Sequence, residues 1–133
     1  MDNEQCCDAA LREKHLQQLQ SQESREMYDR TLAQCLDRPG GLTATDQDMI
    51  FDLCSAEDIK LALAEDIRKR GVVVETRNGR QVFRKENPSM ARMCRYAELQ
   101  RKIRTDLGIT PGKRRAEEEK APEEEEADAF EAF

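Results

Sequence analysis

The sequence has 133 residues, which is enough for one small domain with flanking segments. Charged residues make up 38 % of the chain, tryptophan is absent, and the mean hydropathy is −0.88. This composition excludes a membrane-spanning protein, because no apolar run approaches the roughly 20 residues that a bilayer requires. It also limits the core, since small domains already bury less of their surface than large ones. We therefore expect association between chains to supply part of the stability.

The cysteine pattern argues against a disulfide scaffold and against a metal site. The cysteines are Cys6, Cys7, Cys35, Cys54 and Cys94; their number is odd and no two are spaced as CxxC. His15 is the only histidine, so the ligand spacing of a structural zinc site is missing. The stretch MDNEQCCDAA at the start is acidic and polar, unlike a secretory signal. The sequence therefore predicts no cofactor and a reducing cytosol.

The net charge of −6 conceals three blocks of alternating sign. Residues 1–67 hold 6 basic and 15 acidic side chains, residues 68–115 hold 15 basic and 4 acidic, and residues 116–133 hold 1 basic and 9 acidic. A basic block inside an acidic protein has two interpretations: a solvated surface, or a binding surface for a polyanion, usually nucleic acid. Charge alone leaves both open.

The first third of the chain predicts helix. Residues from about Asp8 to Asp37 are rich in Ala, Leu, Gln, Glu and Arg, which are fair helix formers. The stretch SQES at 21–24 is a possible break, so the pattern fits one long helix or two shorter ones. Residues 1–25 are the most polar part, and we expect a polar N-terminal helical or mobile arm there.

A stop follows at DRPGG, residues 37–41, because proline cannot continue a helix. Either Thr43 or Thr45 can cap the next helix. Apolar residues then recur at helical spacing as far as Gly71, which predicts a core-facing helix over 43–70. They are Met49, Ile50, Leu53, Ala56, Ile59, Leu63 and Ile67.

The stretch VVVETRNGRQVFRK, residues 72–85, predicts a β-hairpin. β-Branched residues precede Asn78-Gly79, a pair that suits the two central positions of a type I′ turn. The pairs expected from that turn are Arg77 with Arg80, Glu75 with Val82, and Val74 with Phe83. The two expected faces are Val72, Val74 and Phe83 on one side, and Arg77, Arg80 and Arg84 on the other. Because an isolated hairpin is barely stable in water, it must lie on helices or add to a neighbour's hairpin.

A last helix is predicted over 88–107. Asn87 can act as its N-cap, Pro88 suits the first helical position, and Gly108 ends it. Its apolar stripe comprises Met90, Met93, Tyr96, Leu99, Ile103 and Leu107, at spacings of three and four. The cations around that stripe are Arg92, Arg95, Arg101, Lys102 and Arg104.

Residues 112–133 form a basic and then acidic tail without periodicity, which predicts disorder. Phe130 and Phe133 are three residues apart, so an induced helix would put them on one face. This favours a partner-docking peptide that folds on binding over a segment that is only solvated.

The order of these elements resembles the small terminase subunits of tailed bacteriophages. The motifs that carry the resemblance are Asn78-Gly79, then Asn87-Pro88, then Leu107-Gly108-Ile109-Thr110-Pro111 followed by Lys113, Arg114 and Arg115. The resemblance runs from about Met27 to Arg115. The elements predict a mainly α fold: a helical protomer with one small β-hairpin and a disordered acidic C-terminal tail. The resemblance implies that protomers assemble into a homo-oligomeric ring, with residues 26–111 as the oligomerisation domain.

The resemblance also implies a non-enzymatic component of the genome-packaging motor, acting in the cytoplasm of the bacterial host. Such a protein binds double-stranded viral DNA and delivers it to the large terminase subunit, which holds the ATPase and nuclease. In agreement, the sequence has neither a GxxxxGK[ST] phosphate loop nor a nuclease constellation, so it predicts no catalytic residue.

The expected DNA-binding residues are Arg68, Lys69, Arg70, Arg77, Arg80, Arg84, Lys85, Arg101, Lys102, Arg104, Lys113, Arg114 and Arg115. These cations would contact phosphate without reading bases, because no recognition helix or stacking aromatic pair is evident. Phe130 and Phe133 are expected to bind the large subunit. The acidic tail can also dock on the basic cluster of its own ring and compete with DNA.

Other interpretations stay open. A small DNA-binding transcription regulator or nucleoid-type protein with an acidic autoinhibitory tail explains the charge blocks, but not the order of hairpin, Asn-Pro helix start and LGITP motif. An adaptor that binds no nucleic acid is a third class. The acidic first third could also form the DNA site, through helices that carry Arg12, Lys14, Arg25 and Arg30.

Overall fold

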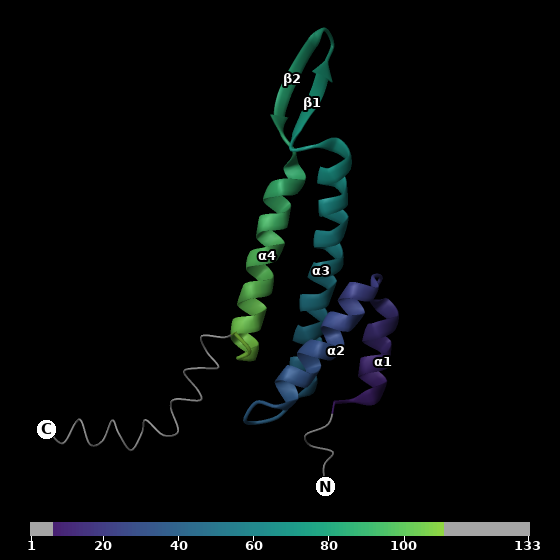
Figure 1. The fold of residues 1–133 in the computed structure, drawn as a ribbon, viewed down its shortest axis with the longest axis vertical. Helices are drawn as coiled ribbons and strands as arrows, with labels where there is room; N and C mark the ends of the chain where they lie inside the picture. Colours follow the sequence, from purple (N-terminus) through teal and green to yellow (C-terminus); the bar gives the residue numbers. More distant parts are fainter. Residues whose placement is uncertain (1–6, 111–133) are drawn as a thin grey trace, which may run out of the picture.

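The computed structural model of the chain describes residues 7–110. Within this range the elements are α1 (Ala9–Gln18), α2 (Gln22–Leu36), α3 (Ala44–Arg70), β1 (Val73–Asn78), β2 (Gln81–Glu86) and α4 (Pro88–Leu107). Figure 1 shows α3 and α4 as a long antiparallel pair, with the hairpin β1–β2 projecting beyond its upper end and α1 and α2 beside the lower half of α3. The predicted mainly α fold with one small β-hairpin is confirmed; the tail at 112–133 lies outside the described residues.

The choice between Thr43 and Thr45 is resolved in favour of Thr43. Its side chain accepts a hydrogen bond from the backbone N–H of Asp46, and the Asp46 side chain accepts one from the backbone N–H of Thr43. This reciprocal capping box satisfies two backbone donors that the first turn of a helix leaves free. α3 therefore starts at Ala44 and runs as far as Arg70, with Gly71 at its end.

The predicted ends of α4 are confirmed. Asn87 accepts a hydrogen bond from the backbone N–H of Ser89, and Pro88 occupies the first turn. At the other end Gly108 adopts a left-handed conformation with φ of 74°, and the backbone N–H of Ile109 donates to the carbonyl of Arg104. This is a Schellman termination, which favours glycine because a side chain is strained at positive φ.

The first third of the chain forms two helices rather than one. α1 ends before Leu19, and Ser21 caps α2 by accepting a hydrogen bond from the backbone N–H of Ser24. The carboxylate of Asp58 on α3 accepts from the backbone N–H groups of Gln20 and Ser21, which fixes the α1–α2 turn against α3. The division of the chain at residue 25 stays a prediction.

The apolar core occupies the lower half of the molecule. Its buried residues are Leu19, Tyr28, Leu32, Cys35, Leu42, Ile50, Leu53, Cys54, Ile103, Leu107 and Ile109. In the upper half, Ile59 and Leu61 are 40 % and 37 % exposed. The interpretation of residues 43–70 as a core-facing helix therefore holds for the lower half of α3 and is wrong for Ile59.

The predicted apolar stripe of α4 is also wrong at one position. Leu99 is 43 % exposed, whereas its neighbour Gln100 is buried. The Gln100 amide donates to the carbonyl of Leu53 and to the carboxylate of Glu57, and its oxygen accepts from Lys60. Because these three bonds satisfy the amide, a polar residue can face α3 where an apolar pattern would place leucine.

The register of the hairpin differs from the predicted one by two residues. Asn78 pairs with Gln81, so Gly79 and Arg80, not Asn78 and Gly79, occupy the turn. A type I′ turn needs positive φ at both central residues, but among the described residues only glycines have positive φ. Gly79, with φ of 64°, stands first in the turn, as in type II′.

A shift of two residues leaves each strand residue on its expected face, because side chains alternate with a period of two. Val74 and Phe83 share one face, and Arg77 and Arg84 share the other, where Arg84 lies opposite Glu75. Arg80 is in the turn, and Val72 precedes β1. The directly opposed pairs are Val73–Glu86, Val74–Lys85, Glu75–Arg84, Thr76–Phe83, Arg77–Val82 and Asn78–Gln81.

Candidate nucleic-acid interface

Four of the cations expected to bind DNA are paired with carboxylates of the same protomer. Arg68 lies 2.5 Å and Lys69 3.6 Å from Glu65. The other two pairs are Arg70 with Asp66 at 2.6 Å and Arg84 with Glu75 at 3.4 Å. The pairs on α3 have spacings of three and four residues, a signal that the sequence itself contains. Their positive charge is offset, so they are weaker candidates for phosphate contact.

Arg70 makes structural hydrogen bonds at the base of the hairpin. It donates to both carboxylate oxygens of Asp66 and to the side-chain oxygen of Asn87. Asn87 in turn donates to the carbonyl of Gly71, and the hydroxyl of Ser89 donates to Asp66 at 2.6 Å. The bonds from Arg70 and Ser89 hold the pKa of Asp66 well below its ordinary value. This cluster joins the end of α3 to the start of α4, with the hairpin between them.

The other cations of the predicted set form two groups far apart. Arg77, Arg80 and Lys85 lie on the hairpin, and we call them the upper cations. Arg101, Lys102 and Arg104 lie near the end of α4, and we call them the lower cations. None of the six makes an ion pair with a described residue. The lower cations start 13 residues into α4, about 20 Å along its axis from the hairpin. Lys113, Arg114 and Arg115 lie outside the described residues.

Two further cations were not among the expected DNA-binding residues. Arg92 and Arg95 are exposed on α4, and neither makes an ion pair within residues 7–110. Their spacing from Leu99 places all three on one helix face, since residues three, four and seven apart are neighbours on a helix surface. The sequence carries this signal, but its apolar periodicity assigns Leu99 to the core.

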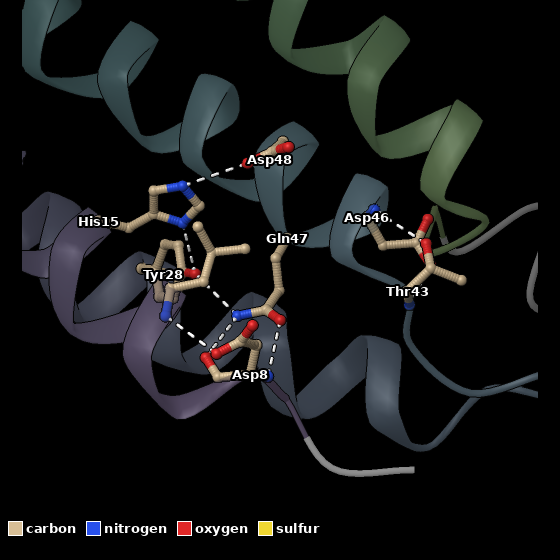
Figure 2. A network of polar contacts seen from close by, with 8 residues as sticks. Asp8, His15, Tyr28, Thr43, Asp46, Gln47 and Asp48 are labelled. Atoms are coloured by element: carbon tan, nitrogen blue, oxygen red, sulfur yellow. Dashed lines mark hydrogen bonds and ion pairs between the residues drawn. The ribbon is translucent and has the colours of Figure 1, made fainter. Parts of the chain in front are cut away.

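A second polar network lies at the lower end, where α1, α2 and α3 meet (Figure 2). His15 is 5 % exposed and stacks on Phe51 with a centroid distance of 4.5 Å. Its Nδ1 lies 2.8 Å from the hydroxyl of Tyr28, and its Nε2 lies 3.3 Å from Asp48. Gln47 contacts the same hydroxyl through Nε2 at 3.4 Å.

The proton positions in this network follow from one backbone group. The backbone N–H of Asp8 can only donate, so the side-chain oxygen of Gln47 must accept from it, at 2.8 Å. The Gln47 NH2 group then donates to the Asp8 carbonyl and to the Tyr28 hydroxyl. That hydroxyl donates to Nδ1 of His15, which leaves the proton on Nε2, facing Asp48. This assignment is made from the hydrogen-bond partners, and it gives each buried donor and acceptor of the network a partner. Because the bonds run from Asp8 and His15 to Tyr28 on α2 and Gln47 on α3, the network holds α1 against both helices.

The described residues offer little for catalysis or metal binding. Burial raises the pKa of the Cys54 thiol to about 12, so the nucleophilic thiolate is not populated near neutral pH. No group of three metal-ligating side chains occurs within residues 7–110. A shallow groove of about 620 Å³ at the hairpin base is lined by Arg70, Val73, Val74, Glu75 and Arg84, but both arginines in it are already paired. No helix in the described range is long and apolar enough to cross a membrane.

The geometry therefore defines a helical protein with unpaired surface cations and an exposed hairpin. The family model described as "Phage terminase, small subunit" matches residues 24–124, and the chain belongs to that family. The predicted resemblance is confirmed, and membership assigns the chain a role in phage genome packaging. Small terminase subunits are in general non-catalytic DNA-recognition components. Comparisons with curated proteins and with solved structures gave no significant match.

Proposed function

We propose that this protein is the oligomeric DNA-recognition component of a packaging motor, without catalytic activity of its own. It binds double-stranded viral DNA and delivers it to the large terminase subunit in the bacterial cytoplasm. The observation that carries the DNA-binding part is that six of the expected DNA-binding cations, the upper and lower groups, make no ion pair with a described residue of this otherwise acidic protein. Unpaired Arg and Lys side chains are those that can neutralise phosphate and release counterions.

The lower cations are the better candidates for the main contact. Lys113, Arg114 and Arg115 follow Arg104 by nine to eleven residues in the chain, so the lower cations and these three belong to one basic stretch of the sequence. Phosphate contacts of this kind position the duplex without reading its sequence. A ring would multiply such weak contacts through effective concentration.

The exposed hairpin supports the oligomeric part of the proposal. Val73 and Val82 are 55 % and 51 % exposed on one face, and Phe83 is 50 % exposed on the other. Both outer strand edges are unpaired within the two-stranded sheet. A hairpin with apolar side chains on both faces and two free edges can contact one neighbour on each side. Such front-to-back contacts are heterologous, and they close into a ring when the rotation per copy allows it.

One part of the proposal concerns residues outside the described range. Phe130 and Phe133 are the proposed contact with the large subunit, carried by the acidic tail at 112–133. Residues 26–111 are the proposed oligomerisation domain.

Binding of a fluorescent DNA duplex, followed by anisotropy at several salt concentrations, tests the proposal. The variant R101A/K102A/R104A removes the unpaired lower cations, and R68A/K69A/R84A is the matched control that removes three paired ones. We expect the first variant to bind less tightly and to lower the salt slope by about 0.9 for each phosphate that is no longer neutralised. The control should change both quantities much less. Equal effects of the two variants would contradict the proposal. So would a DNA affinity of the wild type that does not change with salt concentration.

A further inference from the structure

The outer face of α4 carries an apolar side chain set among unpaired cations. Arg92, Arg95, Leu99 and Lys102 follow at intervals of three, four and three residues, which places them on one face of the helix. We call these four residues the α4 stripe. Leu99 is 43 % exposed, the three cations are exposed, and none of them pairs with a carboxylate in the described part of the chain. α1 and α2 lie beside the lower half of α3 (Figure 1), and all four residues of the stripe are exposed.

This combination fits an acidic segment with apolar side chains better than it fits DNA. A phosphate backbone satisfies the cations but offers no apolar group that would cover Leu99 over its exposed area. An acidic peptide with aromatic residues satisfies both features, because its carboxylates meet the cations while a ring covers the leucine.

The chain itself contains such a segment. Residues 123–133, EEEEADAFEAF, have six side-chain carboxylates and no cation, and Phe130 and Phe133 are three residues apart. We propose that this segment docks on the α4 stripe of its own chain, with a phenylalanine on Leu99 and carboxylates facing Arg92 and Arg95. Docking at this place was not expected from the sequence, which pointed to the basic cluster at 113–115.

The length of the chain permits this contact. Leu99 lies eight residues before the end of α4, about 12 Å back along the helix. The 23 residues from Leu107 to Phe130 can span up to about 75 Å when extended, which is far more than needed. A tether of this kind gives an effective concentration in the millimolar range, so even a weak contact is populated. Docking also covers Lys102, so the segment and DNA would compete there.

Photo-crosslinking in the full-length protein tests the inference without DNA. Phe130→p-benzoylphenylalanine places a crosslinker in the segment, and mass spectrometry locates the adducts after irradiation. We expect adducts on α4 around residues 92–102, and we expect high salt to reduce them because the contact is screened. Both R92E/R95E and L99S should remove these adducts. The matched control K14E/R30E reverses two exposed cations on α1 and α2 that make no ion pair with described residues, and it should retain them.

Three outcomes would overturn the inference. Adducts elsewhere, or none, would show that the segment does not dock on the stripe. Equal yields from R92E/R95E and the control would show that the stripe cations do not hold it. If R92E/R95E or L99S changed the mass of the assembly, the stripe would be a contact between copies instead. Helix content by circular dichroism confirms that each variant is folded. Because no DNA is present, the crosslinking result is independent of DNA binding. Docking of the segment can therefore be refuted while the proposed DNA binding is confirmed, and DNA binding can be refuted while docking is confirmed.

Discussion

Tyr28 is fully buried at the centre of the polar network, and its hydroxyl both accepts from Gln47 and donates to His15. Tyr28→Phe leaves Nδ1 of His15 buried without a donor, so we expect a loss of about 1–3 kcal/mol in the free energy of unfolding. Urea titration followed by circular dichroism measures this loss.

Tyr96→Phe is the matched control, because Tyr96 is half-buried and its hydroxyl has no hydrogen-bond partner among the described residues. It should change the free energy of unfolding by less than about 0.5 kcal/mol. If both variants lost the same stability, the network would not be what holds α1 onto α2 and α3.

Asp66 is expected to make the free energy of unfolding depend on pH in the acid range. Its pKa is held below the ordinary value near 3.8 by Arg70 and Ser89. A carboxylate with a lowered pKa stabilises the fold above its unfolded pKa, and this contribution is lost as the pH falls toward the folded value. We therefore expect the stability of the wild type to decline below about pH 4 more steeply than that of Asp66→Asn.

Urea midpoints measured between about pH 7 and pH 2 give the two curves. The lowered pKa values of Asp46 and Asp58 contribute acid sensitivity to both proteins, so the difference between the curves is what isolates Asp66. Asp106→Asn, at an exposed carboxylate without an ion pair in the described range, should leave the curve of the wild type unchanged. Parallel curves for wild type and Asp66→Asn would contradict the proposed role of the cluster.

At the scale of whole elements, the start of α3 depends on one of two neighbouring threonines. Thr43→Ala removes the capping box with Asp46, and we expect it to cost about 0.5–2 kcal/mol. Thr45→Ala alters an exposed residue inside the first turn that makes no cap, so it should be neutral or slightly stabilising, given the helix propensity of alanine. Chemical unfolding of the two variants compares them directly, and a larger loss for Thr45→Ala would show that α3 starts elsewhere.

The bounds of the helices depend on residues close by in the sequence, whereas the hairpin register and the burial of individual side chains do not. Caps such as Asn87 and Gly108 act within a few residues, so the bounds of α3 and α4 could be predicted closely. The hairpin register could not, because it depends on whether Gly79 alone or Asn78 as well takes positive φ. The burial of Gln100 depends on partners 40 to 47 residues away, and no local pattern reveals them.

The candidate site was predictable only in outline. The charge blocks indicated a basic surface, and the family was correctly identified from the order of its motifs. Which cations are free was not evident from the block charge, because Arg70 serves the hairpin base and Arg84 meets Glu75 across the strands. Arg92 and Arg95 share a helix face with Leu99, which the apolar periodicity of the sequence assigns to the core but which lies on the surface.

At the scale of the whole molecule, a single copy has no apolar core in the upper half of its described residues. The core fills only the lower half. In the hairpin and directly before it, four apolar residues are each at least half exposed: Val72, Val73, Val82 and Phe83. Exposed apolar residues gathered in one region usually mark an interaction surface. We therefore expect the copies to meet through their hairpins and the upper halves of α3.

The most direct test is the solution mass of the full-length protein, measured by light scattering behind a sizing column. One protomer has a mass of 15.3 kDa. We expect one discrete species of many protomers that persists on dilution, and a smaller mass for the hairpin variant V82S/F83S with its helix content unchanged. A wild-type mass of one or two protomers, or a hairpin variant that assembles as the wild type does, would contradict this expectation.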